Sequence, residues 1–187
     1  MGVSISLDAE RIFLQSNYAV MLADITTLPD HARIWIFPAN RALSNAESAE
    51  LLSTLDTYLA NWEAHHVPVQ AARELHFNQF LIIAANPDVT APSGCSIDDM
   101  TRAIKSLGAK FGVDFFGAMK IFYRDGENIR MVTRGEFKQL ATSGDVDAET
   151  VVFDHSLTTL GELREGKWEV SAAASWHSAL LPEVLAL

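Results

Sequence analysis

Two short segments of this chain are apolar on both faces, and this feature constrains the fold more than any other. In residues 32–37, Ile34 and Ile36 point to one side of an extended strand and bulky aromatic residues point to the other. Residues 80–85 are apolar throughout. A strand without a polar face has to be covered on both sides, so we predict that both segments are central strands of one sheet.

Two amphipathic segments follow these strands in turn. Ser44 and Glu47 have the spacing of a capping box, and apolar residues then recur on one helical stripe, which predicts a helix over about 45–64. Ser96 is predicted to cap a second helix, whose apolar stripe ends near Gly112.

The remaining strands of this region mix polar and apolar residues. Residues 69–76 and 119–124 have the pattern of edge strands. The element order over 32–124 is therefore βαββαβ, the ferredoxin-like arrangement. In that arrangement the first and third strands lie in the middle of the sheet, which agrees with the two apolar segments. We predict an α+β protein with this core.

The chain is predicted to have three parts. Residues 1–30 form an N-terminal arm, in which a helix is indicated over about 8–20, and residues 31–124 form the ferredoxin-like domain. Residues 125–187 form a smaller α+β unit. This last unit begins at a turn, Asp125-Gly126-Glu127-Asn128. Thr133 and Glu136 have the spacing of a capping box for a short helix that Gly144 ends, and Ser175 opens a last short helix.

One face of the predicted sheet lacks a cover. Helices cover one face of a ferredoxin-like sheet, and Trp35 and Phe37 would make the other face apolar as well. An exposed apolar patch of this size favours association. We therefore predict that the face of Trp35 and Phe37 is covered, either by the C-terminal unit or by a second copy in a homodimer.

Composition excludes several classes of function. The 187 residues include one cysteine, which rules out an internal disulfide and a cysteine-based metal cluster, and indicates a reducing, cytoplasmic setting. A net charge of −10 disfavours nucleic acid and anionic membranes as partners. The longest apolar stretch is far shorter than the ~20 residues that span a bilayer. The expected partner is a small molecule or a protein, and we predict no cofactor.

Three residues are candidates for chemistry. Cys95 precedes a predicted helix, where free N–H groups and the helix dipole favour a thiolate. His65 or His177 would serve as its base if either came within hydrogen-bond reach. Each has a structural alternative: Cys95 as a packed apolar residue, His65 as a cap at the end of the first helix, and His177 as a docking contact beside Trp176. Neighbouring His65 and His66 lack the i,i+4 spacing of helical metal ligands, so no metal site is predicted.

Several runs of residues occur together in a fixed order. They are Ala32-Arg33-Ile34-Trp35-Ile36, Trp62-Glu63-Ala64-His65, Phe80-Leu81-Ile82-Ile83-Ala84, Ser93-Gly94-Cys95-Ser96-Ile97-Asp98, Asp114-Phe115-Phe116, Thr150-Val151-Val152-Phe153 and Ser175-Trp176-His177. With these runs the chain resembles, from about 32 to 180, a bacterial family whose members often carry the label "ABC transporter ATPase". The chain departs from that pattern at His66, where the relatives carry glycine.

The label of that family does not agree with the residues. A transporter ATPase needs a glycine-rich loop that ends in Gly-Lys-Ser/Thr. The nearest run, Gly108-Ala109-Lys110, lies inside a predicted helix and lacks the hydroxyl. We therefore expect no ATP binding of that kind. Two hypotheses remain open: a non-enzymatic binding or regulatory module, and a small cysteine-dependent enzyme or redox-sensitive protein that uses Cys95 with His65 or His177.

Overall fold

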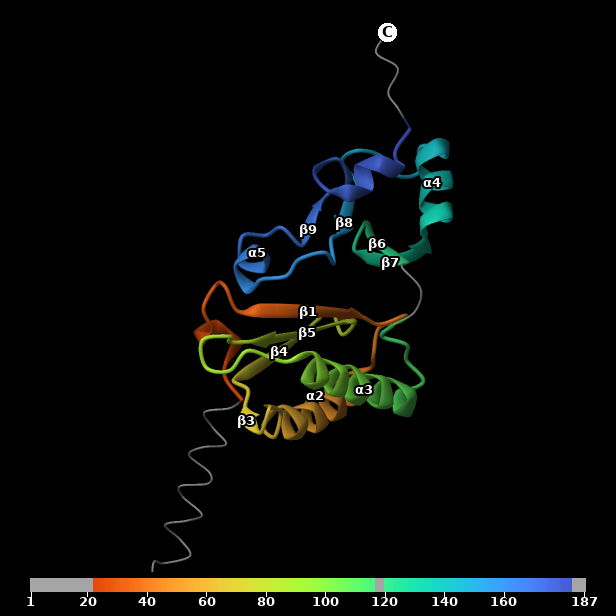
Figure 1. Cartoon of the computed structure of the whole chain (residues 1–187). Coiled ribbons are helices and arrows are strands. Elements are labelled where there is room, and N and C mark those ends of the chain that lie inside the picture. The colour runs from red at the N-terminus through yellow and green to blue at the C-terminus, as the bar shows by residue number, and fades with distance from the viewer. Residues whose placement is uncertain (1–21, 117–119, 183–187) are drawn as a thin grey trace, which may run out of the picture. The chain divides into compact units, whose positions relative to one another are not determined.

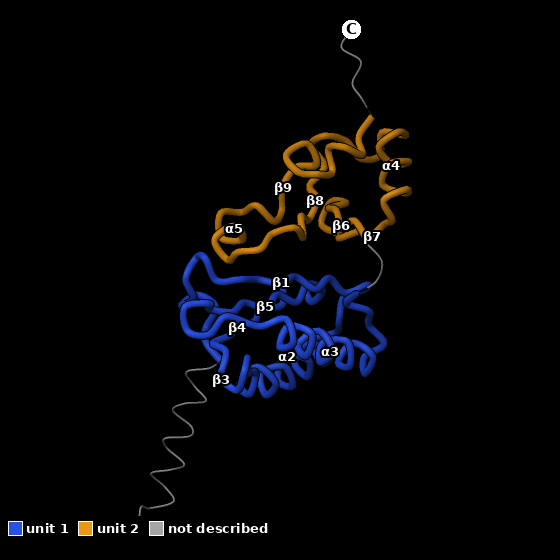
Figure 2. The backbone as a smooth tube through the Cα atoms, in the orientation of Figure 1, with its two compact units in different colours: residues 1–116 blue, residues 117–187 orange. Residues whose placement is uncertain are grey.

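The computed structural model describes residues 22–116 and 120–182. The chain forms two compact units, Met1–Phe116 and Gly117–Leu187 (Figure 2). Both units combine helices with antiparallel strands (Figure 1), which confirms the α+β prediction. The boundary between the units falls before the segment that we predicted as the last strand of the first domain.

The sheet of the first unit has three strands in the order β1-β5-β4. β5 (Phe80–Ala85) lies in the middle, pairs with antiparallel neighbours on both sides, and is buried at every residue. β4 (Ala71–His76) and β1 (Arg33–Pro38) flank it. The central position of residues 80–85 is therefore confirmed. The same prediction for 32–37 is wrong, because β1 pairs only with β5 in the described residues.

The fourth predicted strand belongs to the other unit. β6 (Lys120–Asp125) pairs along its whole length with β7 (Asn128–Thr133), across a loop of two residues that begins with Gly126. This glycine has a φ of 59°, as a tight hairpin turn requires. Closing so short a loop costs little entropy, so the local hairpin forms instead of a long-range pairing with β1. The ferredoxin-like sheet is therefore not confirmed, although β1, β5 and β4 keep the order that three of its strands have.

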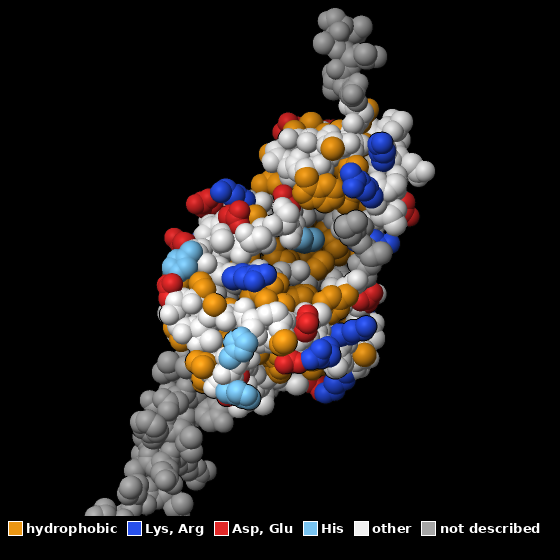
Figure 3. Space-filling view, in the orientation of Figure 1, with side chains coloured by type: hydrophobic (Ala, Val, Ile, Leu, Met, Phe, Trp, Pro, Cys, Tyr) orange, Lys and Arg blue, Asp and Glu red, His pale blue; other side chains and the backbone are white. Residues whose placement is uncertain are grey.

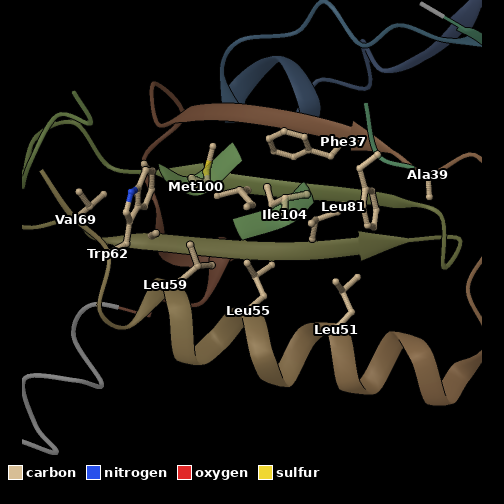
Figure 4. Close-up of a cluster of buried hydrophobic side chains, with 14 of the residues drawn as sticks. Phe37, Ala39, Leu51, Leu55, Leu59, Trp62, Val69, Leu81, Met100 and Ile104 are labelled. Carbon is tan, nitrogen blue, oxygen red and sulfur yellow. The ribbon is translucent and has the colours of Figure 1, made fainter. Parts of the chain in front are cut away.

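Two helices cover one face of the three-stranded sheet. They are α2 (Asn45–Leu59) and α3 (Gly94–Phe111). Figure 4 shows Leu51, Leu55 and Leu59 of α2 pointing from the helix into the space below the strands, and all three are fully buried. The predicted capping box at the start of α2 is confirmed. The helix ends at Leu59, earlier than predicted, because the chain then enters the hairpin of β2 (Glu63–Ala64) and β3 (Val67–Pro68).

The face of the sheet that bears Trp35 and Phe37 is the face that these helices cover. Phe37 belongs to one core cluster with the leucines of α2 and with Met100 and Ile104 of α3, and Trp35 packs against that cluster. The face is thus covered within the chain, but its predicted position opposite the helices is wrong. The reason for expecting a homodimer through it no longer holds.

Residues just before β1 pack against the first unit. Leu22 forms a parallel bridge with Ala71, and the Ala23 N–H donates to the Ala71 carbonyl oxygen at 2.8 Å. A 3₁₀ turn, η1 (Ile25–Thr27), follows, and both Ile25 and Leu28 are buried. The end of the predicted arm is therefore part of the unit. The helix that the sequence indicates over about 8–20 lies outside the described residues.

The second unit is built on a four-stranded sheet in the order β7-β6-β8-β9. Its other elements are β8 (Val151–Phe153), β9 (Glu169–Ser171), α4 (Arg134–Ser143), α5 (Leu160–Arg164), and the 3₁₀ turns η2 (Ala172–Ala174) and η3 (Trp176–Leu180). The core joins Ile121 and Val152 of the sheet with Phe137 of α4 and Leu180 of η3. Among the described residues, no helix has the length and apolar character needed to cross a bilayer.

Candidate functional site

Cys95 lies in the first turn of α3. The N-cap of this helix is Ser93, whose hydroxyl accepts a hydrogen bond from the Ser96 N–H at 3.2 Å. The prediction that Ser96 caps the helix is therefore wrong: Ser96 is buried inside the first turn and donates through its own hydroxyl to the Ser93 carbonyl oxygen. Cys95 is the second residue of the helix and is exposed. The packed alternative for this cysteine does not hold.

His65 lies at the tip of a hairpin and not at a helix end. It forms with His66 the two-residue turn between β2 and β3, and their φ angles are 54° and 63°. Both residues therefore occupy the left-handed region, which glycine adopts without strain. The predicted helix-capping role of His65 is wrong.

The hairpin and the start of α3 lie at the same end of the first unit. The indole N–H of Trp62, just before β2, donates to the Ser96 carbonyl oxygen at 2.9 Å, and this contact is buried. It brings the elements that carry His65 and Cys95 together. Within the described residues, however, no hydrogen bond joins the Cys95 thiol to the His65 ring. A base for the thiol is therefore not assembled at this end.

His177 lies in the second unit, where it is fully buried. Its Nδ1 lies 2.8 Å from the hydroxyl of Ser175, the N-cap of η3, as predicted for the start of this short helix. The ring stacks on Trp176 with 3.8 Å between centroids and packs against Phe137 from α4. Burial lowers the pKa of His177, although the Asp154 carboxylate raises it. The packing of this ring within the second unit agrees with the docking contact that was one of its two predicted roles.

A second, partly buried histidine lies near His177 and was not among the predicted site residues. The indole N–H of Trp168 donates to Nδ1 of His155 at 3.2 Å. Burial lowers the pKa of His155 to about 4; the Asp154 carboxylate opposes this effect, and the charge of a protonated His177 adds to it. The only sequence signal for this residue was its place two residues after a buried strand.

Beside His177, one large aromatic side chain remains open to solvent. Trp176 is 44% exposed. One face of its ring stacks on His177, and the guanidinium of Arg134 lies 5.7 Å from the ring centroid. Lys138 is one helical turn after Arg134 on α4. In the sequence, Trp176 was noted only as the neighbour of His177, and Arg134 was not considered, because nothing in the spacing of 134 and 176 indicates that they meet.

The described residues contain no group of three or more His, Cys, Asp or Glu side chains placed to hold a metal ion. Comparison of the chain with protein-family models, with curated proteins and with solved structures gives no significant match. The resemblance to the bacterial family therefore stays a prediction, and the function has to be argued from the residues alone.

Proposed function

We propose that this chain is a non-enzymatic binding or regulatory module of the cytoplasm whose partner is a protein. The single observation that carries the proposal is the exposed ring of Trp176, which stacks on a buried histidine and lies near the guanidinium of an arginine. The lone cysteine and the net charge of −10 support a reducing compartment and a partner other than nucleic acid.

A fixed and exposed tryptophan is well suited to bind a partner. Tryptophan and arginine are enriched among the residues that contribute most to protein interfaces. The stack on His177 holds the ring of Trp176 in one orientation, so little conformational entropy is lost when a partner covers it. Because His177 is itself anchored to Ser175 and Phe137, the support for the ring is part of the unit's core.

Site-specific photocrosslinking tests this function. A photoreactive phenylalanine analogue replaces Trp176 in the full chain, expressed in its natural host, and the same analogue at Lys105 is the control, because Lys105 is exposed on α3 in the first unit. We expect discrete protein adducts from position 176 and none of the same mass from position 105. A lack of adducts from 176, or the same adducts from both positions, would contradict the proposal.

The exposed Cys95 favours the second candidate function, a cysteine-dependent or redox-sensitive protein. It lies in the first turn of an 18-residue helix, where reagents can reach the thiol. Measurement of the alkylation rate of Cys95 against pH, with the variants His65→Gln and His177→Gln, separates the candidates. If the pH profile of alkylation is the same in the parent chain and in both variants, the binding module stands. A profile that is displaced in either variant would establish a Cys–His pair, and the cysteine-dependent function would replace the binding module.

A further inference from the structure

We propose that Trp176, Arg134 and Lys138 form a docking surface, here called the α4–η3 surface, for a short protein segment that combines acidic and apolar side chains. This inference rests on the proposed binding function and names the chemistry of the partner. Figure 3 shows Lys and Arg side chains beside hydrophobic ones on the visible face of the second unit.

The two cations of this surface are available to a partner. Arg134 and Lys138 are exposed, and within the described residues the side chain of neither takes part in an ion pair or a hydrogen bond. They are four residues apart on α4, so they project from the same side of the helix. Phe137 and Ala141 of the same helix are buried in the core, which fixes the face that α4 presents to solvent.

The apolar residues of the surface flank Trp176 in the sequence. Ala173, Ala174 and Ala179 are exposed in the two 3₁₀ turns η2 and η3. Small side chains leave room for the side chains of a partner, and Trp176 supplies the large area that burial needs. A partner segment with apolar residues would cover these side chains, and its carboxylates would reach Arg134 and Lys138.

The charges around this surface favour an acidic peptide over a nucleic acid. The N–H of Ala173 donates to the Ala148 carbonyl oxygen at 3.0 Å, so a turn carrying the exposed Asp147 and Glu149 borders η2. A phosphate backbone that crossed the surface would meet these carboxylates, and two cations would release few counterions. A short peptide can place its acids over α4 alone.

Fluorescence anisotropy with a labelled synthetic peptide tests the inference on the full chain. The probe alternates aspartate with phenylalanine and leucine; a second peptide has lysine in place of aspartate, and a third probe is a single-stranded oligonucleotide. We expect only the acidic peptide to bind, more weakly as salt is raised. Trp176→Ala and the double variant Arg134→Glu with Lys138→Glu should each weaken binding by about tenfold or more.

Two controls keep the result interpretable. Lys105→Glu reverses one exposed charge of the first unit and should leave affinity almost unchanged. If Trp176→Ala unfolds the second unit, the double variant decides, because its residues lie outside the core. Three results would overturn the inference. The lysine peptide or the oligonucleotide could bind as tightly as the acidic peptide, the double variant could bind the acidic peptide as tightly as the parent chain does, or the acidic peptide could fail to bind. Adducts from position 176 would in that last case still support a binding module with a partner of other chemistry.

Discussion

Single residues in the second unit couple its stability to pH. His155 has its pKa lowered to about 4 in the folded chain, from an ordinary value of 6.5, chiefly because burial disfavours the charged ring. The unfolded chain binds a proton below pH 6.5 and the folded chain does not until about pH 4. Stability is therefore complete above pH 6.5 and is lost as the pH falls from there to about 4.

We predict that this histidine contributes a loss of about 3 kcal/mol in the free energy of unfolding across that pH range. The loss is measured by urea unfolding at pH 7.5 and at pH 4.5, with hydrogen exchange as the probe of the second unit. In His155→Gln the difference between the two pH values should shrink, while His65→Gln, at an exposed hairpin turn, should keep it. An unchanged pH dependence in His155→Gln would show that other groups are responsible.

At the scale of one element, α3 contains Gly108 in its interior, where glycine lowers the stability of a helix relative to alanine. A Cβ at Gly108 would lie 2.5 Å from the Val113 carbonyl oxygen and 3.1 Å from the Phe115 ring. The backbone after the helix turns back at Gly112, which has a φ of 61°, and passes directly over this position. Gly108 is therefore required for the close approach of the chain.

We predict that Gly108→Ala destabilises the first unit by about 1–3 kcal/mol, although alanine is the better helix former. Gly94→Ala is the matched control, since it lies in the same helix and a Cβ there has no neighbour within 4 Å. It should be neutral or slightly stabilising. Denaturant unfolding with a far-ultraviolet signal measures both; equal effects of the two substitutions would argue against the close approach.

At the scale of the whole molecule, the described residues include a core cluster in the first unit and another in the second unit that have no residue in common. Leu55 is fully buried in the core of the first unit, and Phe137 is fully buried in that of the second. Truncation of a buried leucine or phenylalanine to alanine costs about 2–5 kcal/mol.

We therefore predict that Leu55→Ala lowers amide-exchange protection mainly in residues 22–116, and that Phe137→Ala does so mainly in residues 120–182. Hydrogen exchange read by mass spectrometry of the full chain resolves the two regions. Equal loss of protection in both regions from either single substitution would mean that the chain unfolds as one cooperative unit.

The sequence by itself determined the local elements, because their causes are local. The capping boxes at Ser44 and Thr133, the helix end at Gly144 and the apolar strand at residues 80–85 follow from neighbours a few residues apart. The sequence also contains a local indication of the hairpin of β6 and β7, which is the turn at Gly126. The predicted turn at residues 125–128 is confirmed, and a short glycine turn between two strands is also the signal that these strands pair with each other.

The tertiary structure decided the sheet partners and the candidate site. Periodicity tells which side chains of a strand share a face but not which face the helices cover, so Trp35 and Phe37 were placed on the wrong side. The meeting of Arg134 with Trp176, and of His155 with Trp168, joins residues from separate elements. Such contacts depend on how the chain packs as a whole, and no local pattern of residues encodes them.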